Sequence, residues 1–167
     1  KVNYFLTQCA KFLILPSLAF SNARPESKYD FPKIEITDIN GNIVNPIKKK
    51  GNYLVSFWAS WCTSCVTEIK NFTATEKQMN IKGVQLILIN VDRNPKAIKK
   101  FFKKHKLPET TLTYRANMYD ALQQFETTGL PITVAVKDKV VISKYIFLSM
   151  PWQSPKLIDN IVQPFKD

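Results

Sequence analysis

The fold of this chain is decided by the stretch FWASWCTSC, residues 57–65. The nearly continuous apolar run 53–58 is typical of a buried central strand. The segment from Thr63 to about residue 80 has the length and polar composition of a helix. Cys62 therefore stands at the amino end of a helix, where free backbone amides and the helix dipole stabilise a thiolate.

The two cysteines of this stretch form a C-x-x-C pair. Cys65 comes one helical turn after Cys62, so the pair is close enough to form a disulfide, with Cys65 the more buried. Since a thiolate is the attacking species, we expect Cys62 to attack the disulfide of a partner and Cys65 to resolve the mixed disulfide. The spacing thus predicts a redox site.

A C-x-x-C pair is also half of a metal site, but a structural zinc site needs a second pair of ligands. Cys9 is the only other cysteine, and we interpret it as a small apolar residue of a targeting segment. His105 is the only histidine and lies among lysines, which favours a solvated helix face over metal ligation. We therefore expect no metal and no other cofactor.

After residue 31 the chain alternates between apolar and amphipathic segments. Strands are expected on both sides of Asn40-Gly41 and at 53–58, 84–91, 112–114, 132–136 and 140–147. Helices are expected at 63–80, from Asn94-Pro95 to before Leu107-Pro108, at 118–125 and around 157–162. This order implies a partly parallel sheet covered on both faces, whose last two strands are antiparallel because a tight turn at 137–139 joins them.

The chain has 167 residues, the size of one ordinary domain with a single core. Residues 1–23 differ from the rest, since an apolar stretch at 12–20 is followed by Ser21-Asn22-Ala23, small residues of the kind that a signal peptidase accepts. We predict an export signal cleaved after Ala23. The alternative is an uncleaved membrane anchor, although the apolar run is too short to span a bilayer by itself. Residues 24–167 are then the folded domain.

The formal net charge is +11, from 24 Lys and Arg against 13 Asp and Glu. An excess of this size favours solubility and attraction to acidic proteins or anionic lipid, and it specifies no fold. Most of the lysines fall in runs typical of solvated surface, at 48–50, 99–106 and 137–144. Because no nucleic-acid-binding signature accompanies them, we expect no nucleic-acid partner.

The stretch 57–65 resembles the active-site stretch of thioredoxin-like proteins, and Gly129-Leu130-Pro131 is similar to their second landmark. The resemblance covers about residues 31–165 and implies a thioredoxin fold, a central mixed sheet with helices on both faces. In the family the proline of the second landmark forms a cis peptide facing the redox pair, and the resemblance implies that role for Pro131. The residues that it implies in contact with substrate are Trp61, Thr63, Ser64 and Leu130.

Within this superfamily the chain best resembles the TlpA/ResA-like branch. The matches are the export-like amino end, a hairpin built on residues 38–41, Glu68 three residues after Cys65, and an inserted helix-strand block between the strand 84–91 and Pro131. In that branch an acid matching Glu68 lies near the active site and influences the thiol pKa values. The alternative for Glu68 is an ordinary exposed helix glutamate.

Two positions depart from the patterns of the relatives. Ser56 stands where general thioredoxins keep a buried aspartate, so proton transfer at Cys65 cannot use that carboxylate. Ser64 replaces the proline of the usual C-x-P-C form. Because the intervening dipeptide tunes the reduction potential, the direction of electron flow does not carry over from the relatives.

The branch implies an exported thiol–disulfide oxidoreductase that keeps substrate cysteines reduced during cytochrome or oxidase maturation. Its implied partners are a protein with a cysteine pair or disulfide and a membrane-bound electron donor. We expect a monomer in the periplasm or another extracytoplasmic space, free or tethered to the inner membrane. Two alternatives remain: a copper-binding chaperone that uses the same two thiolates, and a disulfide donor or isomerase. The three methionines are scattered, and the C-P-H-C motif of strong oxidants is absent.

Overall fold

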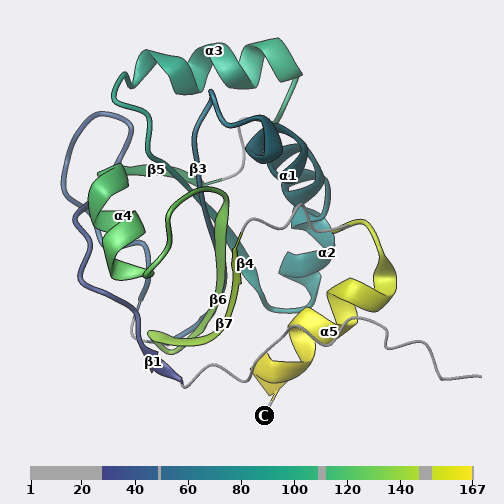
Figure 1. Ribbon diagram of the computed structural model, residues 1–167. Coiled ribbons are helices and arrows are strands. Elements are labelled where there is room, and N and C mark those ends of the chain that lie inside the picture. Colours follow the sequence, from purple (N-terminus) through teal and green to yellow (C-terminus); the bar gives the residue numbers. More distant parts are fainter. Residues whose placement is uncertain (1–27, 49, 109–111, 147–151, 167) are drawn as a thin grey trace, which may run out of the picture.

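The computed structural model describes residues 28–48, 50–108, 112–146 and 152–166. Within them, a seven-stranded sheet runs in the order β1-β7-β6-β3-β4-β5-β2 (Figure 1). The strands are β1 Tyr29–Asp30, β2 Ile36–Thr37, β3 Asn52–Trp58, β4 Gln85–Asn90, β5 Leu112–Ala116, β6 Ile132–Lys137 and β7 Val140–Ile146. The helices are α1 Thr63–Ala74, α2 Glu76–Ile81, α3 Lys96–His105, α4 Met118–Gln124 and α5 Pro155–Lys166.

The strand β3 lies at the centre of the sheet. It pairs in parallel with β4 and antiparallel with β6. The parallel side continues to β5, and the antiparallel side continues to β7. Every side chain of β3 after Asn52 is buried, as expected for a strand that is covered on both faces. The predicted mixed sheet of the thioredoxin fold is confirmed.

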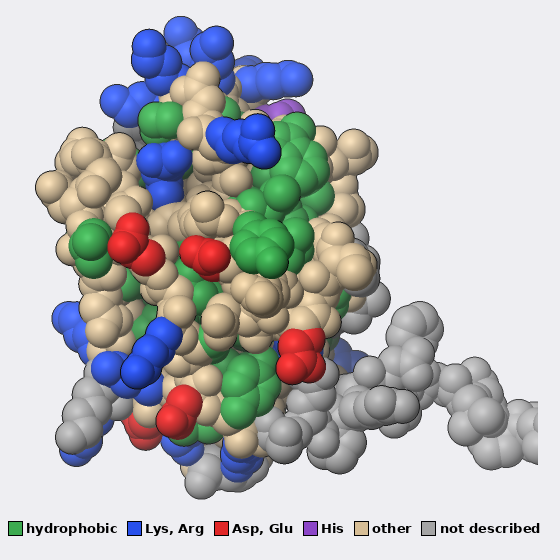
Figure 2. Space-filling view, turned by 60° about the vertical axis from the view of Figure 1, so that its left-hand side comes forward, with side chains coloured by type: hydrophobic (Ala, Val, Ile, Leu, Met, Phe, Trp, Pro, Cys, Tyr) green, Lys and Arg blue, Asp and Glu red, His purple; other side chains and the backbone are tan. Residues whose placement is uncertain are grey.

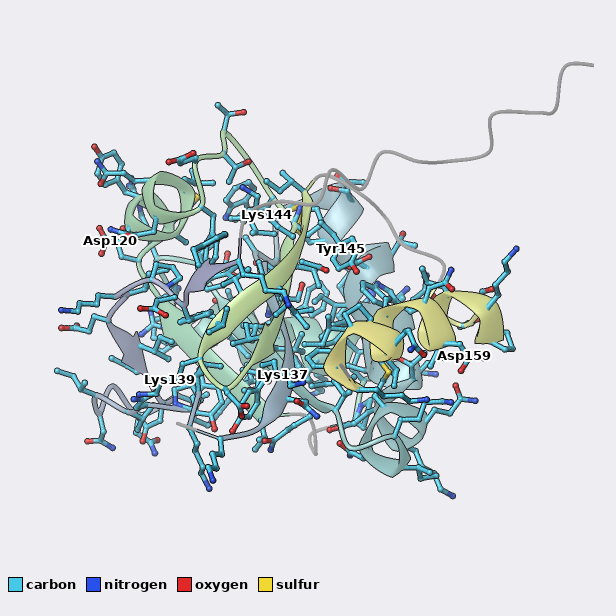
Figure 3. All side chains as sticks on the ribbon, turned by 90° about the horizontal axis from the view of Figure 1, so that it is seen from below. Asp120, Lys137, Lys139, Lys144, Tyr145 and Asp159 are labelled. Atoms are coloured by element: carbon cyan, nitrogen blue, oxygen red, sulfur yellow. A yellow bond between two sulfur atoms is a disulfide. The ribbon has the colours of Figure 1, made fainter. Side chains whose placement is uncertain are left out.

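Helices cover both faces of this sheet. Successive side chains of β3 point to opposite faces, so β3 contacts the helices of both layers. Phe57 packs against Phe125 at the end of α4, with ring centroids 5.2 Å apart. Ser56 points to the other face, toward α1. Figure 1 shows α1, α2 and α5 along one side of the sheet and α4 on the other. Figure 3 shows Asp120 of α4 and Asp159 of α5 on opposite sides of the strands.

Helix α3 lies beyond the carboxyl ends of β3 and β4, at the top of Figure 1. Its apolar side chains Ile98, Phe101 and Phe102 are buried. The ring of Phe101 lies 4.6 Å from that of Trp58, the last residue of β3. The backbone of Val91, after β4, donates a hydrogen bond of 2.9 Å to the carbonyl of Trp58. These contacts fix α3 beside the segment that leads into the cysteines.

The helix expected at 63–80 divides at Thr75, so the prediction of one continuous helix was wrong. The Thr75 side chain donates a hydrogen bond of 2.8 Å to the carbonyl of Phe72, and its backbone N–H donates one of 3.1 Å to the same oxygen. Both bonds span three residues instead of the four of an α-helix. Helix α1 ends at Ala74, and α2 begins at Glu76.

The hairpin expected around Asn40-Gly41 is a tight turn whose two arms make little cross-strand pairing. The Asp38 carboxylate accepts hydrogen bonds from the backbone of Asn40 at 2.8 Å and of Asn42 at 2.9 Å. Hydrogen bonds, first that from the Asn42 side chain, hold the pKa of Asp38 below its usual value. A single bridge joins Thr37 to Ile43. Most of the pairing of β2 is instead with β5.

The expected helix-strand block between β4 and Pro131 is present, since α3, β5 and α4 lie there. Strand β7 ends at Ile146, and Phe147, the last residue of the expected strand, lies outside the described residues. Residues 1–23, with the predicted export segment and Cys9, also lie outside them. In the part of the chain that the structure describes, no helix is both long enough and apolar enough to cross a membrane.

Candidate active site

The two cysteines lie at the junction of β3 and α1 and form a disulfide, with Cα atoms 5.2 Å apart. Cys62 caps the amino end of α1, and its backbone is extended. Cys65 lies within the first turn of the helix. Its side chain is 0% exposed, whereas that of Cys62 is 8% exposed. The greater burial expected for Cys65 is confirmed.

The sulfur of Cys62 is placed where a negative charge is stabilised. The backbone N–H of Cys65 donates a hydrogen bond of 3.2 Å to it, so the sulfur occupies the position of a helix-capping oxygen. The Oγ of Ser64 lies 3.4 Å from the same sulfur. When the disulfide opens, these groups and the positive end of the helix dipole favour the thiolate of Cys62.

Glu68 lies one turn after Cys65, on the same side of α1. Its side chain is fully buried, which excludes an ordinary exposed helix glutamate. The Oε1 of Glu68 lies 3.3 Å from the Oγ1 of Thr133 on β6. That hydroxyl also lies 2.9 Å from the Oγ of Ser56, its cross-strand partner on β3. The carboxyl is therefore held between α1 and the centre of the sheet.

The hydroxyl of Thr133 can serve either protonation state of Glu68. A hydroxyl has one proton, so Thr133 donates to one of its two neighbours and accepts from the other. If Glu68 is ionised, Thr133 donates to the carboxylate and accepts from Ser56. If Glu68 is protonated, Glu68 donates to Thr133, and Thr133 donates to Ser56. When Glu68 gains a proton, the hydroxyls of Thr133 and Ser56 rotate, and no heavy atom has to move.

A buried aspartate, which the sequence analysis did not identify, holds the loop before Cys62. The carboxylate of Asp92 accepts hydrogen bonds from the backbone of Ser60 at 2.9 Å and from its hydroxyl at 3.1 Å. Asn90, at the end of β4, donates a third bond of 2.7 Å. Arg115 of β5 donates a bond of 3.3 Å to the backbone carbonyl of Asp92. The carboxyl ends of three neighbouring strands thus meet at the active-site loop.

The sequence did contain a signal for this contact. Asn90 ends the buried strand after β3 and Asp92 follows it, and side chains at the carboxyl ends of adjacent parallel strands meet at one edge of a sheet. Ser60 stands at the same edge, after β3. The pairing of a short hydroxyl side chain with this aspartate could have been proposed from the strand order.

The peptide bond between Leu130 and Pro131 is cis, as expected. Ile132 pairs with Phe57 at the carboxyl end of β3, so Pro131 lies at the same edge of the sheet as Cys62. Leu130 and Pro131 are both buried.

The other predicted substrate-contact residues are exposed around the disulfide. Thr63 and Ser64 are exposed between the two cysteines, and the side chain of Trp61 is 64% exposed. Trp61 borders an open groove whose other walls are the loop 91–94, the segment from Arg115 to Asp120, and Glu35 and Thr37 at β2. An extended polypeptide beside Trp61 would therefore contact the inserted block.

His105 is not on a fully solvated face, so this prediction was wrong in part. Its ring packs against Phe101, with centroids 4.5 Å apart. Burial, with nearby Lys70 and Lys104 as smaller causes, lowers the pKa of His105. Over the described residues, no group of three or more His, Cys, Asp or Glu side chains is placed to hold a metal ion.

Comparisons with known proteins agree with this geometry. The model of the AhpC/TSA family matches residues 28–145. The chain is 31% identical to the thiol-disulfide oxidoreductase ResA of a Bacillus cereus strain over 78 residues, which are 46% of this chain and 44% of the relative. The match thus spans less than half the length of this curated relative.

Two solved structures share the fold. A thiol:disulfide interchange protein from Bacteroides sp. has a TM-score of 0.65 at 22% identity, covering 80% of this chain and 88% of that one. The thioredoxin domain of a thiol-disulfide oxidoreductase from Bacteroides vulgatus has a TM-score of 0.64 at 22% identity, covering 83% of this chain and 96% of that one. The chain therefore belongs to the AhpC/TSA family and has a thioredoxin-like fold, with the Cys62–Cys65 pair where its central strand meets the first long helix.

Proposed function

We propose that this protein is a thiol–disulfide oxidoreductase that reduces disulfides in protein substrates. The observation that carries the proposal is the placement of the two cysteines. Cys62 caps a helix with its sulfur accepting an amide hydrogen bond, and the more buried Cys65 follows one turn later. The first sulfur is suited to attack, and the second is suited to attack only after a mixed disulfide has formed.

The reaction has two exchange steps. The Cys62 thiolate attacks one sulfur of the substrate disulfide, and the other substrate sulfur leaves as a thiolate that takes a proton from solvent. Cys65 then loses its proton and attacks the sulfur of Cys62, which releases the second substrate thiol and closes the Cys62–Cys65 disulfide. Two electrons have moved to the substrate. A dithiol donor of the membrane returns them to the protein by the reverse exchanges.

Glu68 is the group that we assign to the proton of Cys65. It is buried on the same side of α1, and its network with Thr133 and Ser56 accommodates both states of the carboxyl. Ser56 cannot hold this proton in the way that a carboxylate at its position could. The family resemblance implies that the backbone of Leu130, just before Pro131, pairs with an extended substrate segment.

The biological setting follows from the branch that the chain resembles. We place the protein in an extracytoplasmic space, as a monomer, with residues 1–23 serving as export signal or anchor. Its role is to keep cysteines of a substrate protein reduced during cytochrome or oxidase maturation. What supports this setting is the relationship to ResA-type oxidoreductases and the pattern of residues 1–23.

The test is to trap the substrate. In Cys65→Ser the second exchange is blocked, so the mixed disulfide with Cys62 should accumulate and can be isolated and identified. Cys62→Ser is the matched control and should trap nothing. A small alkylating reagent should also modify Cys62 of the reduced protein well before Cys65. Equal labelling rates, or a mixed disulfide on Cys65 in the control, would contradict the assigned roles.

A further inference from the structure

The segment 93–108 carries only positive charge. It contains no aspartate or glutamate. All of its lysine and arginine side chains are exposed: Arg93, Lys96, Lys99, Lys100, Lys103, Lys104 and Lys106. We call these side chains the α3 basic surface. Figure 2 shows the same concentration, since Lys and Arg side chains gather at the top of the molecule, where α3 lies, and the acidic side chains of this face lie lower.

The outward direction of these lysines is fixed by the packing of α3. Ile98, Phe101 and Phe102 form the apolar side of the helix, and all three are buried. Phe101 and Phe102 lie with their ring centroids 4.6 and 6.1 Å from that of Trp58. Because the apolar side is used inside the domain, α3 cannot insert it into a lipid bilayer. The basic surface can act on a partner only through its charges and hydrogen-bond donors.

The α3 basic surface borders the redox pair. The loop that opens α3 is tied to the active-site loop by the hydrogen bonds between Asp92 and Ser60. Arg93 lines the same groove as the exposed Trp61. At the other end of α3, Lys70 of α1 is close enough to His105 to lower the pKa of that ring. Arg93 is the only member of the α3 basic surface that lines this groove, and the acidic side chains Glu35, Asp92 and Asp120 line it as well. An acidic segment of a polypeptide that brings a disulfide to Cys62 would therefore lie outside the groove, beyond Arg93, on the lysines of α3.

We propose that the α3 basic surface docks an acidic segment of the protein substrate, next to the disulfide that Cys62 attacks; this rests on the oxidoreductase function proposed above. Clustered cations attract a polyanionic partner over about the Debye length of 8 to 10 Å at physiological salt. Charge complementarity of this kind raises the rate of encounter and selects among partners. The surface favours a polypeptide over a lipid headgroup layer because it adjoins the groove beside Trp61, where the reacting chain lies.

The experiment measures the first exchange step in the full chain carrying Cys65→Ser. Three synthetic peptides share one disulfide loop and differ in the flanking residues, which are glutamates, glutamines or lysines. The Cys62 thiolate attacks the loop disulfide, one peptide sulfur joins Cys62, and the other leaves as a thiolate. The rate of mixed-disulfide formation is followed by acid quenching and mass spectrometry. We expect the glutamate peptide to react at least about tenfold faster than the glutamine peptide at low salt.

Two charge-reversal variants separate a local effect from an effect of net charge. The double variant Lys99→Glu with Lys103→Glu reverses two charges that lie one turn apart on α3. Lys139→Glu with Lys166→Glu makes the same change in net charge elsewhere; Figure 3, viewed from the end opposite α3, shows Lys139 on the near side. We expect the preference for the glutamate peptide to disappear in the α3 variant and to persist in the other. Equal loss in both variants, or no preference in the parent, would overturn the proposal.

Two further measurements keep the outcomes distinct. A small uncharged disulfide should react with all variants at rates that differ much less than the rates of the glutamate peptide do, and failure of that reaction in the parent contradicts the oxidoreductase function without touching the docking site. Docking is then tested separately by NMR shifts of α3 amides on addition of a cysteine-free glutamate peptide. If anionic vesicles bind the parent through Lys99 and Lys103 while the glutamate peptide does not, the surface recognises lipid and the proposal is wrong.

Discussion

The hydroxyl of Thr133 lies 3.3 Å from the Glu68 carboxyl and thereby joins helix α1 to strand β6 beneath the redox pair. Glu68 should oppose ionisation of the thiols, because a buried carboxylate disfavours a second negative charge nearby. In Glu68→Gln we expect the midpoint of the pH profile of thiol alkylation to move to lower pH. Glu126→Gln, which neutralises an exposed carboxylate, should leave the profile unchanged. A midpoint that moves to higher pH in Glu68→Gln would refute this role.

Thr133→Val should destabilise the protein by about 1 to 3 kcal/mol, because it removes a partner from two buried polar groups, Ser56 and Glu68, while keeping the shape of the side chain. Thr133→Ser keeps the hydroxyl and should recover most of the loss from the network. Urea unfolding of the oxidised protein measures both. Equal stability of Thr133→Val and the parent would show that these hydrogen bonds contribute nothing to folding.

Asp92→Ala should loosen the loop that presents Cys62. It removes the acceptor for both hydrogen bonds from Ser60 and for the bond from Asn90. Ser60→Ala removes only the hydroxyl donor and should have a smaller effect, about 1 kcal/mol in the free energy of unfolding. Hydrogen exchange of the Ser60 and Trp61 amides gives the local readout. If exchange there is unchanged in Asp92→Ala, the aspartate does not position the loop.

His105 reports on the charge of the α3 basic surface, since it is the only histidine. Its pKa is lowered first by burial and then by Lys70 and Lys104. Lys104→Glu should therefore raise the pKa of His105, whereas the distant change Lys139→Glu should leave it unaltered. The titration of the ring protons by NMR measures both.

The same shift has a consequence for stability. Because the folded-state pKa lies below the usual 6.5, the unfolded chain binds the proton more tightly. His105 thus makes the protein less stable as the pH falls below about 6.5. Lys104→Glu should make that loss of stability smaller. If the loss of stability at low pH is larger in Lys104→Glu than in the parent, this prediction is wrong.

The sheet and the redox pair were predictable because their signals are local. Continuous apolar runs such as 53–58 determine buried strands, and C-x-x-C after such a run determines the site. The division at Thr75 was missed because the composition of 63–80 does not mark it, and the bonds that Thr75 makes to Phe72 are visible only in the structure. The tether through Asp92 depends on residues far apart in the sequence, and only the strand order brings it to Ser60. Burial of Glu68 likewise depends on the neighbouring β6 and not on the pattern of α1.

The last prediction concerns the reduction potential of the Cys62–Cys65 pair. A pair becomes a strong oxidant when its reduced form is over-stabilised, as in DsbA at about −120 mV, whereas thioredoxin lies at about −270 mV. Here the residues between the cysteines, Thr63 and Ser64, are neutral, and Glu68 opposes the thiolate. The exposed lysines of α3 act in the opposite direction, but water and salt screen them. We therefore expect a potential nearer to that of thioredoxin than to that of DsbA.

Equilibration against a series of glutathione buffers measures this potential. In a buffer held at a redox potential of about −150 mV, between the two reference values, the pair should be almost fully oxidised. In Glu68→Gln the thiolate is less opposed, so the potential should rise, while Lys99→Glu with Lys103→Glu should lower it by a smaller amount. A pair that stays reduced at about −150 mV would make this protein a disulfide donor, because its disulfide would then be a stronger oxidant than the disulfides of most proteins that it could meet.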